Sequence, residues 1–217
     1  MIQQYKKYTD TAIKELNNPT FNITKQYLAV MKIDIENDAP KIARISNKPE
    51  SPTIDIYFHI KHERFFLVVS VRKKPIEVDW IWIESGHQVY FTATSKELTY
   101  NELTKQLSLS PLSGWSKEDK RKQNQQKYTF SRVIYEPNTN EAYELEEKLI
   151  ELLSELEKDT QGVRSLSKIA ETSISICRHQ YISANTGIHF NMDIISRLNK
   201  LNLEIDIDTY ISGTEII

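Results

Sequence analysis

Acidic residues alternate along the last predicted strand. Glu204, Asp206 and Asp208 are separated by Ile205 and Ile207, and alternate residues of a strand project to one face of a sheet. Three carboxylates in a row could bind a cation or a basic protein surface. The same pattern is typical of an exposed edge strand, where charge discourages unwanted pairing. We expect the edge strand, with both isoleucines facing the core, and retain Asp206 and Asp208 as candidate binding residues.

Cations gather in a polar stretch that follows a tryptophan. They are Lys117, Lys120, Arg121, Lys122 and Lys127. A basic loop beside an exposed tryptophan can bind phosphate or an acidic protein surface. A solvated loop is the simpler interpretation, because the stretch also contains acids and cations alone define no pocket. Trp115, Lys117 and Arg121 are candidate binding residues under the first interpretation.

The single cysteine, Cys177, lies two residues before His179, so a strand would place both on one face. A thiol beside an imidazole is the arrangement of a nucleophile and its base. Cysteine is also among the most buried residue types, and a small buried side chain is the simpler interpretation. The neighbouring Arg178 and Tyr181, together with His179, are candidate binding residues.

The sequence contains no recognised catalytic or cofactor motif. We find no Gly-x-Ser-x-Gly elbow, no His-Glu-x-x-His, no phosphate-binding glycine loop and no dinucleotide fingerprint. His59 and His62 are three residues apart, a spacing that on a strand points the two side chains to opposite faces, whereas metal ligands must converge. Only a turn between them would bring them together. We expect no catalytic residue, no cofactor and no metal, and we favour a binding protein over an enzyme.

Composition limits the class of protein. The chain has 217 residues, of which 39% are hydrophobic, enough to build a packed core. A net charge of −2 provides no global field to attract nucleic acid. One cysteine excludes an internal disulfide. The sequence shows neither a secretory signal nor a membrane span, so we expect a cytoplasmic location and no membrane partner.

The N-terminal part is predicted to be a helix followed by strands. Residues 3–16 have helical spacing of apolar side chains, and residues 26–35 alternate as a strand does, though imperfectly. Residues 38–52 contain three prolines and are predicted to be mostly loop. Residues 54–60, 65–71, 78–83 and 89–94 are rich in β-branched and aromatic side chains and are predicted strands. Trp80 and Trp82 are expected to be covered by core packing.

The C-terminal part alternates helices and strands. Thr99 and Glu102 form a predicted capping box. Leucines at helical spacing predict the longest helix over residues 141–158, and shorter helices are expected after Gly162 and over residues 193–201. Residues 128–135, 173–181 and 203–207 are predicted strands.

Residues 88–213 resemble a bacterial family, the domain of unknown function number 4279. The matching features include Gly114-Trp115-Ser116-Lys117, the segment from Cys177 to Tyr181, Gly187-Ile188-His189 and the run from Leu198 to Leu203. The resemblance implies an α+β fold, a bacterial origin and a small cytoplasmic protein. It also suggests, for some members, a role as immunity partners of toxins, and it names no activity.

The whole sequence predicts an α+β fold, with antiparallel or mixed sheets and helices packed on one side. We expect two closely joined portions, an N-terminal α+β portion over residues 1–86 and a C-terminal α+β domain over residues 87–217. The favoured function is a non-enzymatic protein-binding module, with a toxin as the partner and this chain as its immunity protein. The alternative is an enzyme or small-ligand sensor with a pocket between the portions, lined by Trp115, Arg121, Arg178, His179 and Asp206.

Overall fold

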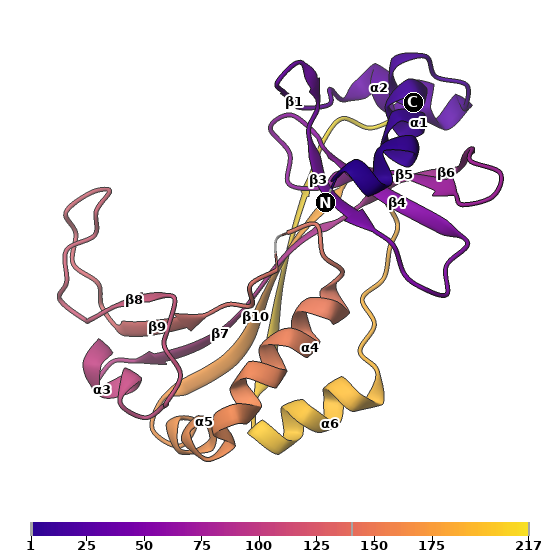
Figure 1. Ribbon diagram of the computed structural model, residues 1–217. Coiled ribbons are helices and arrows are strands. Elements are labelled where there is room, and N and C mark those ends of the chain that lie inside the picture. The colour runs from indigo at the N-terminus through magenta and orange to yellow at the C-terminus, as the bar shows by residue number, and fades with distance from the viewer. Residues whose placement is uncertain (1, 140, 217) are drawn as a thin grey trace. The chain divides into compact units, whose positions relative to one another are not determined.

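The computed structural model describes residues 2–139 and 141–216 (Figure 1). Contacts within the chain define two compact units. The first unit comprises Met1–Gly86, Arg178–Thr186 and Thr209–Ile217, and the second comprises His87–Cys177 and Gly187–Asp208. The sequence placed one boundary near Gly86. The two later segments also belong to the first unit, because strands β10 (Glu171–Tyr181) and β11 (Glu204–Ser212) each contribute residues to both units.

The first unit is built on a four-stranded antiparallel sheet in the order β3-β4-β5-β6. Its strands are β3 (Ile42–Ser46), β4 (Thr53–His59), β5 (Phe66–Arg72) and β6 (Val78–Glu84). A short ribbon of β1 (Ile35–Glu36) and β2 (Ala39–Pro40) precedes them. Consecutive strands are neighbours, as short connections favour.

Helices α1 (Lys6–Asn17) and α2 (Asn22–Val30) follow the short 3₁₀ helix η1 (Ile2–Tyr5). Ala12 and Leu16 of α1 join Ile56, Phe58 and Val69 of the sheet in one apolar cluster. Glu15 links the two helices, because its carboxylate accepts hydrogen bonds from the backbone N–H groups of Thr20 and Phe21.

The first unit differs from the prediction in two segments. The expected strand at residues 26–35 is helical as far as Val30, because Ile23, Tyr27 and Val30 lie at helical spacing and pack against the core. This packing overrides the strand preference of the β-branched residues. Residues 38–52, predicted to be mostly loop, also contain β3, which pairs with β4 although its sequence shows no clean alternation.

The prediction that core packing covers Trp80 is also wrong. It projects from the edge strand β6 and keeps 65% of its surface exposed. Trp82 is half-buried, and its Nε1 donates a hydrogen bond to the carboxylate of Glu84 over 3.0 Å.

The second unit is built on a five-stranded sheet in the order β11-β10-β7-β9-β8. Besides β10 and β11, its strands are β7 (Gly86–Ser95), β8 (Ser113–Trp115) and β9 (Ser131–Tyr135), and β9 runs antiparallel to both β7 and β8. Its helices are α3 (Tyr100–Thr104), α4 (Leu145–Leu156), α5 (Thr160–Leu166) and α6 (Met192–Leu201), and the 3₁₀ turn η2 (Glu157–Asp159) joins α4 to α5. The predicted capping box of Thr99 and Glu102 is confirmed at the start of α3.

Helices α4, α5 and α6 lie along one side of this sheet (Figure 1). The predicted leucine stripe of α4 is confirmed, since all five of its leucines are buried. They pack with Phe91 of β7, Val133 of β9 and Ile176 of β10 in one cluster. The predicted α+β class, with antiparallel or mixed sheets, is confirmed.

Candidate functional site

Alternation along the strands gives the sheet of the second unit two different faces. Val89, Phe91 and Ala93 of β7 belong to the apolar cluster beneath the helices. The intervening Tyr90, Thr92 and Thr94 project to the other side. We call that second side the open face, because α4, α5 and α6 all pack on the first.

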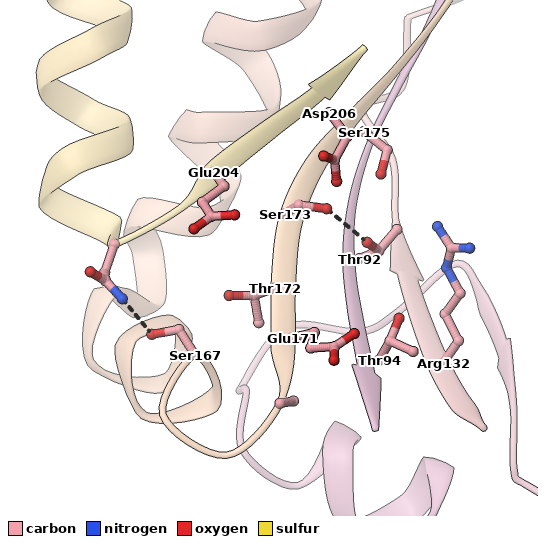
Figure 2. A pocket seen from close by; sticks show the side chains of 12 residues that line it. Thr92, Thr94, Arg132, Ser167, Glu171, Thr172, Ser173, Ser175, Glu204 and Asp206 are labelled. Carbon is pink, nitrogen blue, oxygen red and sulfur yellow. Dashed lines mark hydrogen bonds between the residues drawn. The ribbon is translucent and has the colours of Figure 1, made fainter. Parts of the chain in front are cut away.

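The open face is hollowed where β7, β9, β10 and β11 adjoin. The hollow has a volume of about 500 Å³, and hydroxyl and carboxylate side chains dominate its lining (Figure 2). The residues that carry these groups and one guanidinium are Thr92, Thr94, Arg132, Ser167, Glu171, Thr172, Ser173, Ser175, Glu204 and Asp206.

Hydrogen bonds position several of these side chains. The hydroxyls of Thr92 and Ser173 lie 3.4 Å apart, which links β7 to β10 (Figure 2). At the rim, the amide of Asn202 donates to the hydroxyl of Ser167 over 3.3 Å. Asn202 has a positive φ of 56° at the end of α6, a conformation that asparagine tolerates better than most residues. The wall of the hollow is therefore held by local side-chain contacts.

Negative charge is concentrated on the β11 side of the open face. Glu204, Asp206 and Asp208 are exposed on this edge strand, and Glu171 lies at the start of the neighbouring β10. Across residues 2–139 and 141–216, none of these four carboxylates has a hydrogen bond or ion pair to another side chain. Unpaired carboxylates beside a hollow can receive donors from a ligand.

Arg132 provides positive charge on the β9 side of the hollow. Its guanidinium carbon lies 5.9 Å from the centre of the Tyr90 ring, a cation–π contact across β9 and β7. The Nε of Arg132 is buried and has no hydrogen-bond partner among the described residues. The hollow therefore has an acidic side and a cationic side.

Tyr90 has a perturbed acidity. Burial raises the pKa of its phenol to about 12, and a hydrogen bond with the Cys177 thiol adds to the effect. The phenol oxygen and the Cys177 sulfur are 3.2 Å apart. Cys177 is thus buried beside Tyr90, in line with the simpler interpretation of the cysteine.

The predicted acidic row is located on an edge strand, as expected. The apolar residues between these acids were predicted to face the core, and one of them does not. Leu203 is buried and Ile205 packs against the core, but Ile207 is 40% exposed. The apolar cluster under the helices ends at Ile205, so Ile207 has no core to enter.

Trp115, Lys117 and Arg121 lie in the second unit, on or after β8. Trp115 is half-buried, and its ring stacks on that of Tyr128 with 4.5 Å between centroids. Trp115 and Arg121 both line a second hollow. Lys117 does not line this hollow, and its Nζ donates to the carbonyl of Lys96 over 3.2 Å.

Arg178, His179 and Tyr181 lie in the first unit. Arg178 is buried, and its guanidinium donates to the carbonyl and the hydroxyl of Thr186. Burial lowers the pKa of Arg178, while the charge of Glu84 acts in the opposite direction. The His179 ring stacks on Tyr210 at 5.3 Å.

Tyr181 is buried against Phe65, with 5.3 Å between ring centroids, and its hydroxyl donates to the carbonyl of Thr214 over 2.6 Å. These contacts give Tyr181 a packing role. The residues proposed for a shared pocket line different hollows: Asp206 lines the hollow of the open face, and Trp115 and Arg121 line the second one.

Most residues of the open face were not predicted from the sequence. Thr92, Ser173, Ser175 and Arg132 were not singled out, although a signal was present. The run from Ser173 to Ile176 alternates hydroxyl and apolar residues. A strand with one buried face and one hydroxyl-rich face has this pattern.

Two further structural findings concern metal sites and membranes. Within the part of the chain that the structure describes, no group of three or more His, Cys, Asp or Glu side chains is placed to hold a metal ion. Among the same residues, the helices are too short or too polar for any of them to cross a bilayer.

The fold and the site define an α+β protein whose second unit has one helix-covered face and one open polar face. The chain belongs to the family described as a domain of unknown function (DUF4279), whose sequence profile matches residues 84–212, more than half of the chain. This confirms the resemblance noted in the sequence. Searches of curated proteins and of solved structures gave no match.

Proposed function

We propose that this chain is a non-enzymatic protein-binding module whose open face receives a basic surface of a partner protein. The observation that carries the proposal is the set of unpaired carboxylates on β11 and β10, namely Glu204, Asp206, Asp208 and Glu171. Complementary charge across an interface accelerates association and fixes its orientation. An acidic surface also repels the phosphate backbone of nucleic acid.

The other side chains of the open face support the same proposal. Hydroxyls of Thr92, Ser173 and Ser175 can each donate or accept a hydrogen bond, so they adapt to a polar partner. Arg132, on the opposite side of the hollow, provides a cation that an acidic group of the partner can pair with. A surface with charge of both signs accepts its partner in one orientation.

The finer proposal is that the partner is a toxin and that this chain is its immunity protein. Enzymes that act on nucleic acids have basic surfaces, because they must bind phosphate. A toxin of that class would present positive charge that complements the carboxylates of β11 and β10. Binding of this kind would block the toxin by covering its substrate site and would need no catalytic group on this chain.

The test begins with co-expression of the chain with the products of its neighbouring genes, followed by affinity measurement on each purified complex. Asp206→Lys reverses one charge of the open face, and Glu50→Lys makes the same change at an exposed position of the first unit. Loss of a charged pair at an interface costs about tenfold or more in affinity. We expect that loss for Asp206→Lys and less than about twofold for Glu50→Lys.

Two results would count against this proposal. One is that no neighbouring-gene product forms a stable complex with the wild-type chain. The other is equal weakening by Asp206→Lys and Glu50→Lys, which would show that only net charge matters. Protection of cells from the neighbouring toxin, lost in the Asp206→Lys variant, would support the immunity role specifically.

A small-ligand sensor is a second candidate. The volume of the hollow, about 500 Å³, lies within the range of about 300–1,000 Å³ that is usual for ligand sites. Its acidic and hydroxyl lining would suit a small cationic or hydroxylated molecule. A thermal-shift screen of polyamines and sugars distinguishes the two candidates, since a sensor would be stabilised by a small molecule in the absence of any protein.

A further inference from the structure

An aromatic stack organises the loop between β8 and β9. The rings of Trp115 and Tyr128 are 4.5 Å apart and only 18° from parallel. The guanidinium carbon of Arg121 lies 5.1 Å from the centre of the Tyr128 ring. Phe130 contacts Trp115 at 5.9 Å. These contacts hold the side chain of Arg121 in one place on an otherwise polar loop.

Backbone hydrogen bonds close the same loop. The N–H of Arg121 donates to the carbonyl of Gln126 over 2.7 Å, and the N–H of Tyr128 donates to the carbonyl of Asp119 over 3.0 Å. Lys120 and Lys127 form an antiparallel bridge. The cations of this loop are therefore carried on a hydrogen-bonded hairpin.

The acidic residues of the loop are already engaged. The carboxylate of Glu118 pairs with Lys127 at 2.8 Å, and that of Asp119 accepts the N–H of Ser116 over 2.7 Å. The side chains of Lys120, Arg121 and Lys122 have no acidic partner among the described residues. Three consecutive cations thus remain without a counter-charge.

These cations line the second hollow, which has a volume of about 720 Å³ and also includes Asp119, Gln123 and Tyr128 in its wall. The carboxylate of Asp119 is engaged by the backbone N–H of Ser116. Two buried donors of lining residues have no hydrogen-bond partner in the described chain, the Nε1 of Trp115 and the Nε of Arg121. Buried N–H groups are nearly always paired in proteins. Two unpaired donors and three unpaired cations in one hairpin indicate that an acceptor-rich ligand completes the site.

We propose that this hairpin binds a phosphate-bearing small molecule, with Arg121 as the principal ligand-binding residue and Lys120 and Lys122 as flanking cations. The planar guanidinium offers paired N–H groups that match two oxygens of one phosphate. Three positive charges suit a diphosphate better than a single phosphate. The ring of Tyr128 is stacked on Trp115 and also faces Arg121, so it serves to position Arg121 and not to stack on a base.

The experiment is a calorimetric titration of the full chain with sodium pyrophosphate at low ionic strength. The variant is Arg121→Gln, and its matched control is Arg164→Gln, which removes an exposed arginine from α5. A second variant, Arg121→Lys, keeps the charge and removes the planar fork. A hexaglutamate peptide, titrated into the wild-type chain, tests whether any polyanion binds.

We expect pyrophosphate to bind the wild type, with affinity reduced about tenfold or more by Arg121→Gln and unchanged by Arg164→Gln. Arg121→Lys should fall between them, because charge alone replaces only part of a bidentate contact. The proposal is overturned if pyrophosphate fails to bind the wild type, if both Gln variants weaken it equally, or if hexaglutamate binds as tightly as pyrophosphate. Thermal unfolding of each variant confirms that the fold is retained.

Discussion

The two faces of the five-stranded sheet have opposite chemistry although the same strands form both. On the covered face, Phe91, Val133 and Ile176 are fully or almost fully buried beneath the helices. On the open face, their neighbours Thr92, Arg132 and Ser175 line a polar hollow. Because alternate residues of a strand face opposite sides of the sheet, one strand can use half of its side chains for core packing and the other half for binding.

Mutations on the two faces should therefore have different effects. A substitution on the covered face removes buried apolar contacts and should lower the free energy of unfolding. A substitution on the open face changes the polar groups that line the hollow and should mainly change recognition.

The largest effect is expected at Leu149 of α4, which is fully buried in the apolar cluster between the helices and the covered face. Leu149→Ala removes buried methyl groups and leaves a cavity, which costs about 2–5 kcal/mol of the free energy of unfolding. Equilibrium denaturation with urea measures this loss. The control is Ile150→Ala on the same helix, where the side chain is 41% exposed, and a comparable loss there would break the contrast between covered and exposed positions.

An intermediate effect is expected at Asp159, which caps α5 of the helix layer. Its carboxylate accepts the N–H of Gly162 at 2.9 Å and that of Ser108 at 2.7 Å. Asp159→Ala removes this cap and should cost about 0.5–2 kcal/mol. The same change at Asp193, an exposed residue of α6 that caps no helix, should cost less in the same denaturation experiment.

The contribution of Asp159 should depend on pH. The hydrogen bond from the Ser108 backbone, followed by that from Gly162, holds the pKa of Asp159 below its ordinary value of 3.8. Because the folded-state pKa is the lower one, the stabilisation is complete above pH 3.8 and is lost as the pH falls through the folded-state pKa. The difference between wild type and Asp159→Ala should therefore shrink in acid, and a constant difference at all pH values would contradict the cap.

The smallest effect is expected at Tyr90 on the open face. Burial first, and the hydrogen bond with Cys177 second, raise the pKa of Tyr90 to about 12. Cys177→Ala removes the second cause, so the pKa should fall towards 10.0 while burial keeps it above that value. Nuclear magnetic resonance of labelled tyrosine follows this titration, and an unchanged pKa would show that the thiol does not contribute.

The sign of the linkage at Tyr90 is opposite to that at Asp159. A raised folded-state pKa gives stability that is complete below the unfolded value of 10.0 and is lost as the pH rises towards about 12. Ionisation of Tyr90 should therefore lower the free energy of unfolding in strong alkali. Protonation of Asp159 should lower it in acid.

Alternation and spacing were enough to predict most of the second unit. The α4 stripe, the Thr99 capping box and the β11 edge strand follow from local patterns that packing reinforces. Local reasoning was wrong at α2, where tertiary packing of Ile23 and Tyr27 decided between two allowed structures. It also missed β3, which is stabilised by pairing with a strand that follows a loop.

The candidate site was harder to predict because it depends on which strands are neighbours. The acidic row of β11 could be predicted from the sequence. That it shares a hollow with Glu171 and Arg132 depends on the strand order β11-β10-β7-β9. The burial of Lys148 could not be predicted from the sequence either. It lies buried on the leucine helix, where its Nζ donates to the carbonyl of His87 over 2.7 Å.

The most direct test of the open face as a recognition surface is a map of backbone amide shifts in the second unit when a neighbouring-gene protein is added. The account predicts that the largest changes occur on β10, β11 and β7, around Ser175, Asp206 and Thr92. Changes confined to the exposed sides of α4, α5 and α6, with the open face unaffected, would contradict it.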